Sequence, residues 1–220
     1  APPPAGPLRI VFSGGPVSVL MISLLAALSL TAMALAVEHL LAIRRDVLIP
    51  PGLAPAVRRH LSSGNVSAAR KACDAEPSPL SVVLRAGLAE APLGWTHMEK
   101  AMEEMLAEQS ARLLRKIDYL SVIGNIAPMV GLLGTVVGMI FAFQEVADAE
   151  GAARAADLAS GIYQALVTTV GGLLIAIPSL AAYAVFRNRV DRLIAETAYS
   201  AQHAVAPLKM ALLGAKPPQE

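Results

Sequence analysis

Residues 125–138 read Asn-Ile-Ala-Pro-Met-Val-Gly-Leu-Leu-Gly-Thr-Val-Val-Gly, and this stretch decides the fold. It lies within residues 119–144, a run that contains no Asp, Glu, Lys, Arg or His. A second run of this kind covers residues 158–186. Each is longer than the ~20 apolar residues with which a helix crosses a bilayer. The sequence therefore predicts two membrane-spanning helices in the second half of the chain.

A third charge-free run covers residues 10–37, and its apolar core lies at 17–37. This core is longer than the ~7–15 apolar residues of a signal peptide, and no basic segment precedes it. Glu38 and His39 follow it, where a signal peptide would have a cleavage site of small residues. We interpret the run as a retained first span. The chain does not begin with Met, which leaves processing or trimming of the N-terminus open.

The composition supports a membrane protein, because 55% of the residues are hydrophobic and only 16% are charged, whereas soluble domains carry about 25% charged residues. The predicted fold class is an all-α integral membrane protein with three transmembrane helices, long cytoplasmic helix extensions and a helical cytoplasmic insert. In chain order, we expect a periplasmic N-terminal segment at 1–16, the first span at 17–37, the insert and helix extension at 38–120, the second span at 121–146, a periplasmic loop at 147–159, the third span at 160–186, and a cytoplasmic helix and tail at 187–220.

Basic residues near the ends of the spans predict the orientation. Three spans place the two termini on opposite sides of the membrane, and Lys and Arg gather on the cytoplasmic side. Only Arg9 and Arg154 fall on the side of the N-terminus, which is therefore expected to be periplasmic, with the C-terminus cytoplasmic. The residues on the cytoplasmic side are Arg44, Arg45, Arg112, Arg115, Lys116, Arg187, Arg189 and Arg192.

Proline and glycine divide the cytoplasmic insert into short helices. Asn65 is expected to cap one of them or to sit in a turn. Thr96, with Glu99 three residues on, is the expected N-cap of a long amphipathic helix that continues into the second span. The third span should likewise continue into the cytoplasm, with Pro207 in a frayed tail. The short helices are expected at residues 57–61, 66–73 and 80–89.

Residues suited to covalent or metal chemistry are scarce. The single cysteine, Cys73, is expected to be a small buried side chain. The spans contain no carboxylate pair, and the sequence has no GxSxG elbow, Walker loop or HExxH pattern. We therefore expect no enzyme activity, no metal and no cofactor. Without a basic patch interleaved with aromatic residues, we also expect no nucleic-acid partner. The four histidines are scattered outside the spans, at His39, His60, His97 and His203.

The second and third spans carry small and polar residues at helical spacing. Gly134 and Gly138 form a GxxxG pattern, which lets two helix backbones approach closely. Pro128 and Pro178 lie inside the spans, where each frees backbone carbonyls and favours a kink. The residues expected to pack helices together are Gly131, Gly134, Gly138, Gly161, Ala165, Gly172 and Ala176. Thr135, Gln164, Thr168 and Thr169 indicate a weakly polar path lined by protein.

Two long motifs resemble the MotA/TolQ/ExbB proton-channel family. Residues 125–138, quoted above, are similar to its second-span signature. Residues 161–178, Gly-Ile-Tyr-Gln-Ala-Leu-Val-Thr-Thr-Val-Gly-Gly-Leu-Leu-Ile-Ala-Ile-Pro, are similar to its third-span signature. The insert, with Ser-Pro-Leu at 78–80, resembles that of the ExbB/TolQ branch, the biopolymer transport proteins of the ExbB type. The short cytoplasmic part also favours this branch over MotA, which has a fourth span. The resemblance covers residues 17–201.

The resemblance implies a motor subunit of the bacterial inner membrane, which converts proton motive force into mechanical work and energises outer-membrane transport or envelope maintenance. Such proteins form a ring of five around the single spans of ExbD- or TolR-like partners, and a TonB- or TolA-like protein is a further partner. Thr135 and Thr169 match the threonines that line the ring, and are carried over as ion-pathway residues together with Thr168 and Gln164. Many relatives have Glu at the position of Gln164, so a proton relay through that Glu is not carried over.

The residues alone lead to a compatible hypothesis. The second and third spans contain no carboxylate, Lys or His, so a proton site at mid-membrane must come from a partner whose own span carries a carboxylate. Three alternatives stay open: a non-conducting oligomeric scaffold, a solute transporter with its own binding site, and sodium instead of protons as the coupling ion. The sequence also leaves open the cargo, the receptor, and whether the system is of the ExbB or the TolQ type.

Overall fold

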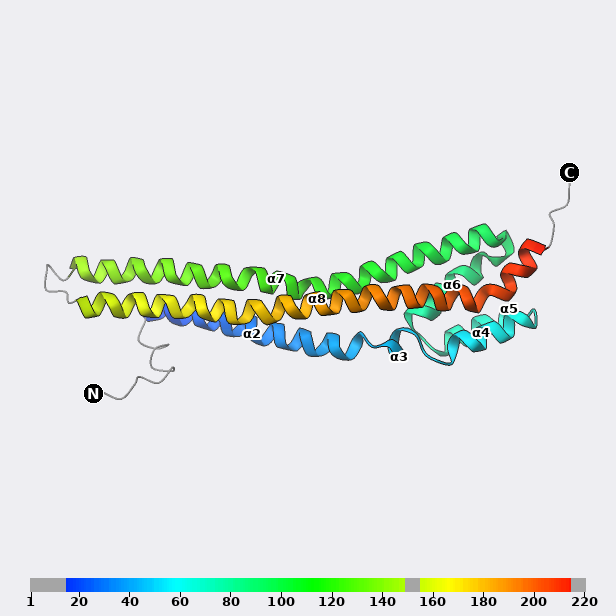
Figure 1. Cartoon of the computed structure of the whole chain (residues 1–220), viewed down its shortest axis with the longest axis horizontal. Coiled ribbons are helices and arrows are strands. Elements are labelled where there is room, and N and C mark those ends of the chain that lie inside the picture. Colours follow the sequence, from blue (N-terminus) through cyan, green and yellow to red (C-terminus); the bar gives the residue numbers. More distant parts are fainter. Residues whose placement is uncertain (1–14, 149–154, 215–220) are drawn as a thin grey trace. The chain divides into compact units, whose positions relative to one another are not determined.

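The computed structural model describes residues 15–148 and 155–214, and within these ranges every regular element is a helix (Figure 1). A long helix, α2 (Gly15–Ala42), is followed by short helices and then by two very long ones. The short elements are α3 (Arg45–Leu48), α4 (Leu53–Ser62), α5 (Val66–Ala75), α6 (Pro79–Glu90) and the 3-10 helix η1 (Ala91–Leu93). The long helices are α7 (Trp95–Asp148) and α8 (Ala155–Gly214).

Three helices are long and apolar enough to cross a membrane, namely Val19–Ala42 in α2, Trp95–Gln144 in α7 and Gly161–Gly214 in α8. The predicted all-α membrane fold is therefore confirmed. The segment boundaries expected within these helices stay predictions. Residues 1–14 and 149–154 lie outside the described residues, and with them Arg9, Arg154 and most of the expected periplasmic segments.

The short helices begin and end where turn residues and caps place them. Asn65 caps α5, because its side-chain oxygen accepts a hydrogen bond from the Ala68 N–H at 2.9 Å. Ser78 and Ser81 form a capping box at the start of α6, in which each hydroxyl accepts from the backbone N–H of the other. Pro79 follows at the first helical position, where its missing N–H removes no helical bond. The prediction for Asn65 is confirmed.

The predicted N-cap of α7, Thr96, is wrong by two residues, because Gly94 is the residue that directly precedes the helix. The helix begins at Trp95, and the Gly94 carbonyl accepts the first backbone bond, from the Met98 N–H at 3.2 Å. Gly94 has a φ of +99°, a conformation that side chains disfavour, so the turn into α7 is set by this glycine. Glu99 accepts from the indole N–H of Trp95 at 3.0 Å instead of completing a capping box.

The predicted tail at Pro207 is also wrong, because α8 continues through this residue to Gly214. Proline has no N–H, so the His203 carbonyl loses its helical donor at this point. Ala204 and Val205, immediately before it, are fully buried. Burial of this apolar face outweighs the loss of one backbone bond, and the helix passes through the proline.

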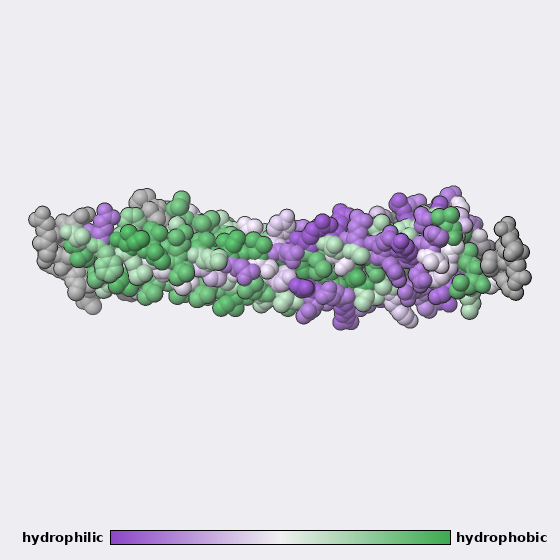
Figure 2. All heavy atoms as spheres, turned by 90° about the horizontal axis from the view of Figure 1, so that it is seen from above, coloured by the Kyte–Doolittle hydropathy of each residue, from purple (hydrophilic) through white to green (hydrophobic). Residues whose placement is uncertain are grey.

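Two compact units make up the chain, and each is described by itself. The apolar unit comprises Ala1–Glu38 and Ile117–Ala184, and the polar unit comprises His39–Lys116 and Val185–Glu220. In the space-filling view, hydrophobic side chains cover most of the visible surface of the apolar unit, whereas the polar unit carries most of the hydrophilic ones (Figure 2). Large apolar side chains on α2, α7 and α8 are exposed in the apolar unit, as expected for a surface in contact with lipid or other helices. Examples are Leu30, Met129, Leu132, Leu174 and Ile177.

The polar unit has a conventional hydrophobic core, built where the short helices pack on α7 and α8. Its fully buried side chains come from all these helices, so burial of apolar surface stabilises the group of short helices together. Gly87 on α6 is part of this packing, since a Cβ there would lie 2.5 Å from Met102 Cγ. The core includes Leu48, Leu53, Val57, Leu80, Leu84, Met98, Val190 and Val205.

Candidate functional site

The candidate site is the seam between α7 and α8 in the apolar unit. We define the seam by the small residues that bring the two helices together: Gly131, Gly134 and Gly138 on α7, and Ala165, Thr168 and Gly172 on α8. A Cβ at Gly134 would lie 2.6 Å from Thr168 Oγ1, and a Cβ at Gly172 would lie 2.5 Å from the Ala127 carbonyl oxygen. Real Cβ atoms essentially never approach within 3.0 Å. The two backbones therefore lie so close together that only glycine fits at these positions.

The seam continues toward the end of α7. A Cβ at Gly138 would lie 3.0 Å from Ala165 Cβ, and one at Gly161 would lie 2.5 Å from Ala142 Cβ. Ala165 and Ala176 are buried on α8. Of the seven residues for which the sequence predicted a packing role, the five glycines lie where an added Cβ would meet the neighbouring helix at 3.0 Å or less, and the two alanines are buried.

Thr168 joins the two helices through a hydrogen bond. Its hydroxyl lies 3.1 Å from the Gly131 carbonyl oxygen on α7 and 2.7 Å from the Ala165 carbonyl oxygen on its own helix. The single hydroxyl proton is therefore shared between two acceptors. The side chain is buried. These contacts place Thr168 within the helix packing, although the sequence placed it with the ion pathway.

Thr169 has a buried hydroxyl without a partner. It is the only buried side-chain nitrogen or oxygen among the described residues that makes no hydrogen bond. A threonine in a helix usually donates to the carbonyl four residues earlier, which here belongs to Ala165. That carbonyl already accepts the helical N–H and lies 2.7 Å from the Thr168 hydroxyl. The hydroxyl of Thr169 is thus buried without a partner in this chain.

Thr135 lies on the buried face of α7, and its hydroxyl donates to the Leu132 carbonyl at 2.7 Å. It makes no hydrogen bond with Thr169. Gln164 is half-buried on α8. Pro128 and Pro178 lie within α7 and α8, which continue through them. The ion-pathway role of Thr135, Gln164, Thr168 and Thr169 remains a prediction.

Sequence reasoning missed part of the seam. A Cβ at Gly124 would lie 2.6 Å from Leu180 Cγ, and Ala127 and Ala142 are buried against α8. The signal was present, because small residues recur on α7 at positions 124, 127, 131, 134, 138 and 142, in steps of three and four. The small-residue stripe therefore extends about two turns before the predicted one and about one turn after it.

Sequence reasoning also missed a contact of His39, which belongs to the polar unit. Only 2% of it is exposed. Its Nε2 lies 3.0 Å from the Lys116 carbonyl oxygen on α7, and its ring meets Phe186 of α8 edge-on, at 5.9 Å between centroids. One imidazole thus joins the end of α2 to both long helices. A lone histidine carries no spacing signal, so the sequence did not reveal this contact.

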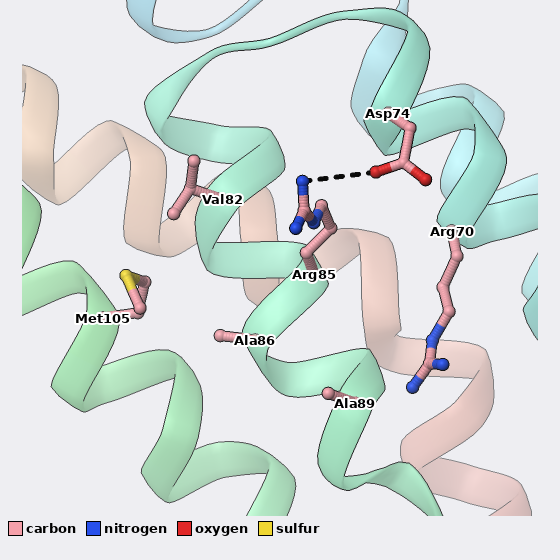
Figure 3. Close-up of a pocket in the computed structure, with 7 residues that line it drawn as sticks. All are labelled: Arg70, Asp74, Val82, Arg85, Ala86, Ala89 and Met105. Carbon is pink, nitrogen blue, oxygen red and sulfur yellow. Dashed lines mark ion pairs between the residues drawn. The ribbon is translucent and has the colours of Figure 1, made fainter.

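The polar unit also contains a hollow of about 440 Å³ between α5, α6 and α7 (Figure 3). Arg85 Nη1 at its edge lies 3.3 Å from Asp74 Oδ1, and Arg70 Nη2 donates to the Leu88 carbonyl at 2.6 Å, near the end of α6. Both arginines therefore have structural partners. Small side chains, Ala86 and Ala89, leave the space open.

Two groups of the polar unit, Cys73 and Glu196, have shifted pKa values. Burial, with a smaller contribution from the neighbouring Asp74 carboxylate, raises the pKa of the Cys73 thiol to about 11, so the thiol is neutral at physiological pH. Cys73 is buried, as the sequence predicted. Hydrogen bonds from Arg45 and Arg192 lower the pKa of Glu196. Among the described residues, no three His, Cys, Asp or Glu side chains are placed to hold a metal ion.

Close packing through small residues is typical of neighbouring helices in membrane proteins. The family model described as the MotA/TolQ/ExbB proton channel family matches residues 75–198. The chain belongs to this family, and the resemblance stated from the two motifs is confirmed. The match covers both helices of the seam.

Three relatives support the ExbB/TolQ branch. A biopolymer transport protein ExbB homolog of Methanothermobacter thermautotrophicus is 28% identical, over 84% of this chain and 64% of the relative. Biopolymer transport protein exbB1 of Vibrio cholerae is 39% identical over 44% of this chain and 43% of its own length. The Tol-Pal system protein TolQ of Pseudomonas aeruginosa is 36% identical over 43% and 41%. The chain thus spans less than two thirds of the length of these curated relatives.

A solved structure of C. jejuni MotAB has the same fold. It superimposes with a TM-score of 0.55 and covers 97% of this chain and 83% of that chain, at 18% sequence identity. At this level of identity the similarity shows the fold alone. The protein is an integral membrane protein of the proton-channel family.

Proposed function

We propose that this protein is a proton-driven motor subunit of the bacterial inner membrane, with its N-terminus in the periplasm and its C-terminus in the cytoplasm. Copies of the chain form a ring around the single span of an ExbD- or TolR-like partner. The ring converts proton motive force into mechanical work on that partner, and so energises outer-membrane transport or envelope maintenance through a TonB- or TolA-like protein. The role requires no covalent catalysis and no cofactor.

One observation carries the proposal, the unpartnered hydroxyl of Thr169, which lies beside the seam in a run without charged side chains. Residues 119–144 and 158–186 contain no group that could hold a proton at mid-membrane near neutral pH. A partner carboxyl group must therefore supply the titrating site. Rotation about χ1 would let the Thr169 hydroxyl donate to the ionised carboxylate or accept from the protonated acid. The seam thus offers a polar contact in both protonation states.

The energies agree with a stepping motion. One elementary charge that crosses a potential of about 150 mV releases about 3.5 kcal/mol. Polar contacts within membranes average only about 0.6 kcal/mol. A few contacts between the ring and a partner carboxyl group are therefore weak enough to be broken at each proton transfer, and the partner does not become fixed in one position.

The test compares two threonine variants in the complete complex, reconstituted into liposomes with its single-span partner. Thr169→Val should reduce potential-driven proton flux at least tenfold, because the polar contact is lost with little change in shape. Thr31→Val is the matched control, since Thr31 lies exposed on α2 and its hydroxyl bonds only to the Ala27 carbonyl of its own helix. This control should conduct like the wild type.

Other outcomes would identify the alternatives. Undiminished flux and coupled activity in Thr169→Val, with an intact ring, would contradict the ion-pathway role and favour a scaffold. A flux that depends on the sodium concentration at constant pH would show that sodium, not the proton, is the coupling ion. Solute uptake by the chain reconstituted without its partner would indicate a transporter.

A further inference from the structure

A pair of arginines in the polar unit has no part in the proposed motor. Arg45 in α3 donates through Nε to Glu196 Oε2 at 3.1 Å, and Arg192 in α8 donates through Nε to Glu196 Oε1 at 3.1 Å. One carboxylate thus holds two guanidinium groups beside each other, although their charges repel. We call these three residues the clamp. The arginine side chains are 60% and 79% exposed, so a ligand can reach both.

The clamp presents unused hydrogen-bond donors. A guanidinium group has five N–H donors, and each arginine uses only Nε on Glu196, which leaves the two terminal nitrogens of each for another partner. The hydrogen bonds also lower the pKa of Glu196, which favours its ionised form. Two arginines and one carboxylate leave one net positive charge. The clamp is therefore a preorganised cationic group with free donors.

The clamp borders a hollow of about 700 Å³, which Ala195, Tyr199 and Ser200 complete. Tyr199 and Ser200 follow Glu196 by three and four residues, so they share its face of α8. The hydroxyls of Tyr199 and Ser200 make no hydrogen bond with the residues that the structure describes. The Tyr199 ring stacks on His203, with centroids 5.9 Å apart, which holds the tyrosine beside the hollow. Charged and neutral donors thus border one space.

We propose that this hollow binds a phosphate group. Guanidinium groups bind phosphate through paired N–H bonds, and phosphate oxygens can accept from several directions at once. A volume of this size also admits an organic group attached to the phosphate. Two sources share this chemistry, a phospholipid headgroup and a soluble phosphate compound. Arg45 lies three residues beyond Ala42, where the first apolar helix ends. In the proposed orientation this places the clamp near the phospholipid headgroups of the cytoplasmic leaflet.

The experiment uses the full-length chain purified in a neutral detergent. Two probes are titrated separately, short-chain phosphatidylglycerol and inorganic phosphate, with short-chain phosphatidylcholine as a lipid without net charge. The shift of the thermal unfolding midpoint with probe concentration gives an apparent Kd. Arg45→Gln and Arg192→Gln should each weaken binding at least tenfold. Arg192→Lys should weaken it by a smaller factor, because lysine keeps the charge but lacks the paired donors.

Matched controls separate the clamp from a general surface charge. Arg44→Gln and Arg189→Gln remove the same charge one and three residues away, outside the hollow, and should change the apparent Kd by about twofold or less, as for exposed charges. Binding of phosphatidylglycerol alone would identify a lipid headgroup, and equal binding of inorganic phosphate would identify a soluble ligand. Equal weakening by the control and clamp variants, binding of neither probe, or unchanged binding in Arg192→Lys would overturn the proposal.

Discussion

At the residue scale, two adjacent threonines on α8 have opposite surroundings. Thr168 shares its hydroxyl proton with a carbonyl of the neighbouring helix, whereas the Thr169 hydroxyl is buried without a partner. Thr168→Val should therefore lower the stability of the detergent-purified chain by roughly 0.6–1.7 kcal/mol, the range for hydrogen bonds between membrane helices. Thr169→Val should be neutral or slightly stabilising, because it removes an unsatisfied polar group. Reversible unfolding in mixed micelles measures both, and a larger loss in Thr169→Val would contradict the assignment.

Cys73 gives a second test at this scale. Its thiol is buried, and burial raises its pKa to about 11. Because only the thiolate reacts with alkylating reagents, the native protein should be modified at pH 8 at least a hundredfold more slowly than the denatured chain. Mass spectrometry after a timed exposure to iodoacetamide measures this ratio. Similar rates in the native and denatured states would show that α5 opens freely or that the thiol is accessible.

At the element scale, glycine spacing sets how closely α7 and α8 approach. Gly172→Ala would place a Cβ 2.5 Å from the Ala127 carbonyl oxygen. This contact should destabilise the seam by about 1–3 kcal/mol, the usual cost of overpacking. Gly171→Ala is the matched control, since its Cβ would meet Leu25 at an ordinary 3.6 Å. The control should be tolerated and gain helix propensity. Equal unfolding midpoints for the two variants would show that the helices separate more easily than the geometry indicates.

A second element-scale prediction concerns the link between α3 and α8. The folded-state pKa of Glu196 lies below the value of 4.5 for an unperturbed glutamate. The stability that its ion pairs contribute is therefore present above about pH 4.5 and lost as the pH falls through the folded-state pKa. The wild type should unfold at a higher temperature than Glu196→Gln at pH 7, and the difference should vanish in acid. Glu103→Gln, which removes an exposed carboxylate of α7, is the matched control for the loss of one negative charge.

Much of this architecture follows from the sequence, and the exceptions have physical reasons. The length of the charge-free runs predicted the apolar helices, and the helical spacing of glycine predicted the seam. Both signals can be read from the chain itself. The N-cap of α7 and the continuation of α8 through Pro207 were missed. The local backbone conformation of Gly94 sets the first, and tertiary packing of the buried face around Val205 sets the second. The partners of His39 and the different hydrogen bonding of Thr168 and Thr169 were equally inaccessible, because they depend on which backbone carbonyls lie nearby.

At the scale of the whole molecule, charged side chains are separated from the charge-free runs of α7 and α8. The side chains with shifted pKa values, Cys73 and Glu196, belong to the polar unit, whereas the charge-free runs of α7 and α8 belong to the apolar unit. A chain built in this way can line a proton path without storing a proton in it. The proposed function therefore assigns proton storage to the partner and mechanical support to this protein.

This division of labour predicts that the two components conduct only together. Liposomes that contain the assembled chain alone should show no more potential-driven proton flux than empty liposomes, because α7 and α8 offer no titrating group at mid-membrane. Addition of the single-span partner should raise the flux at least tenfold, and replacing the partner's membrane carboxylate by its amide should abolish the increase. A pH-sensitive dye inside the liposomes reports the flux, with an uncoupler added at the end to show that the vesicles are sealed. Proton-selective flux through the chain alone, at the rate of the full complex, would mean that this protein has a proton site of its own.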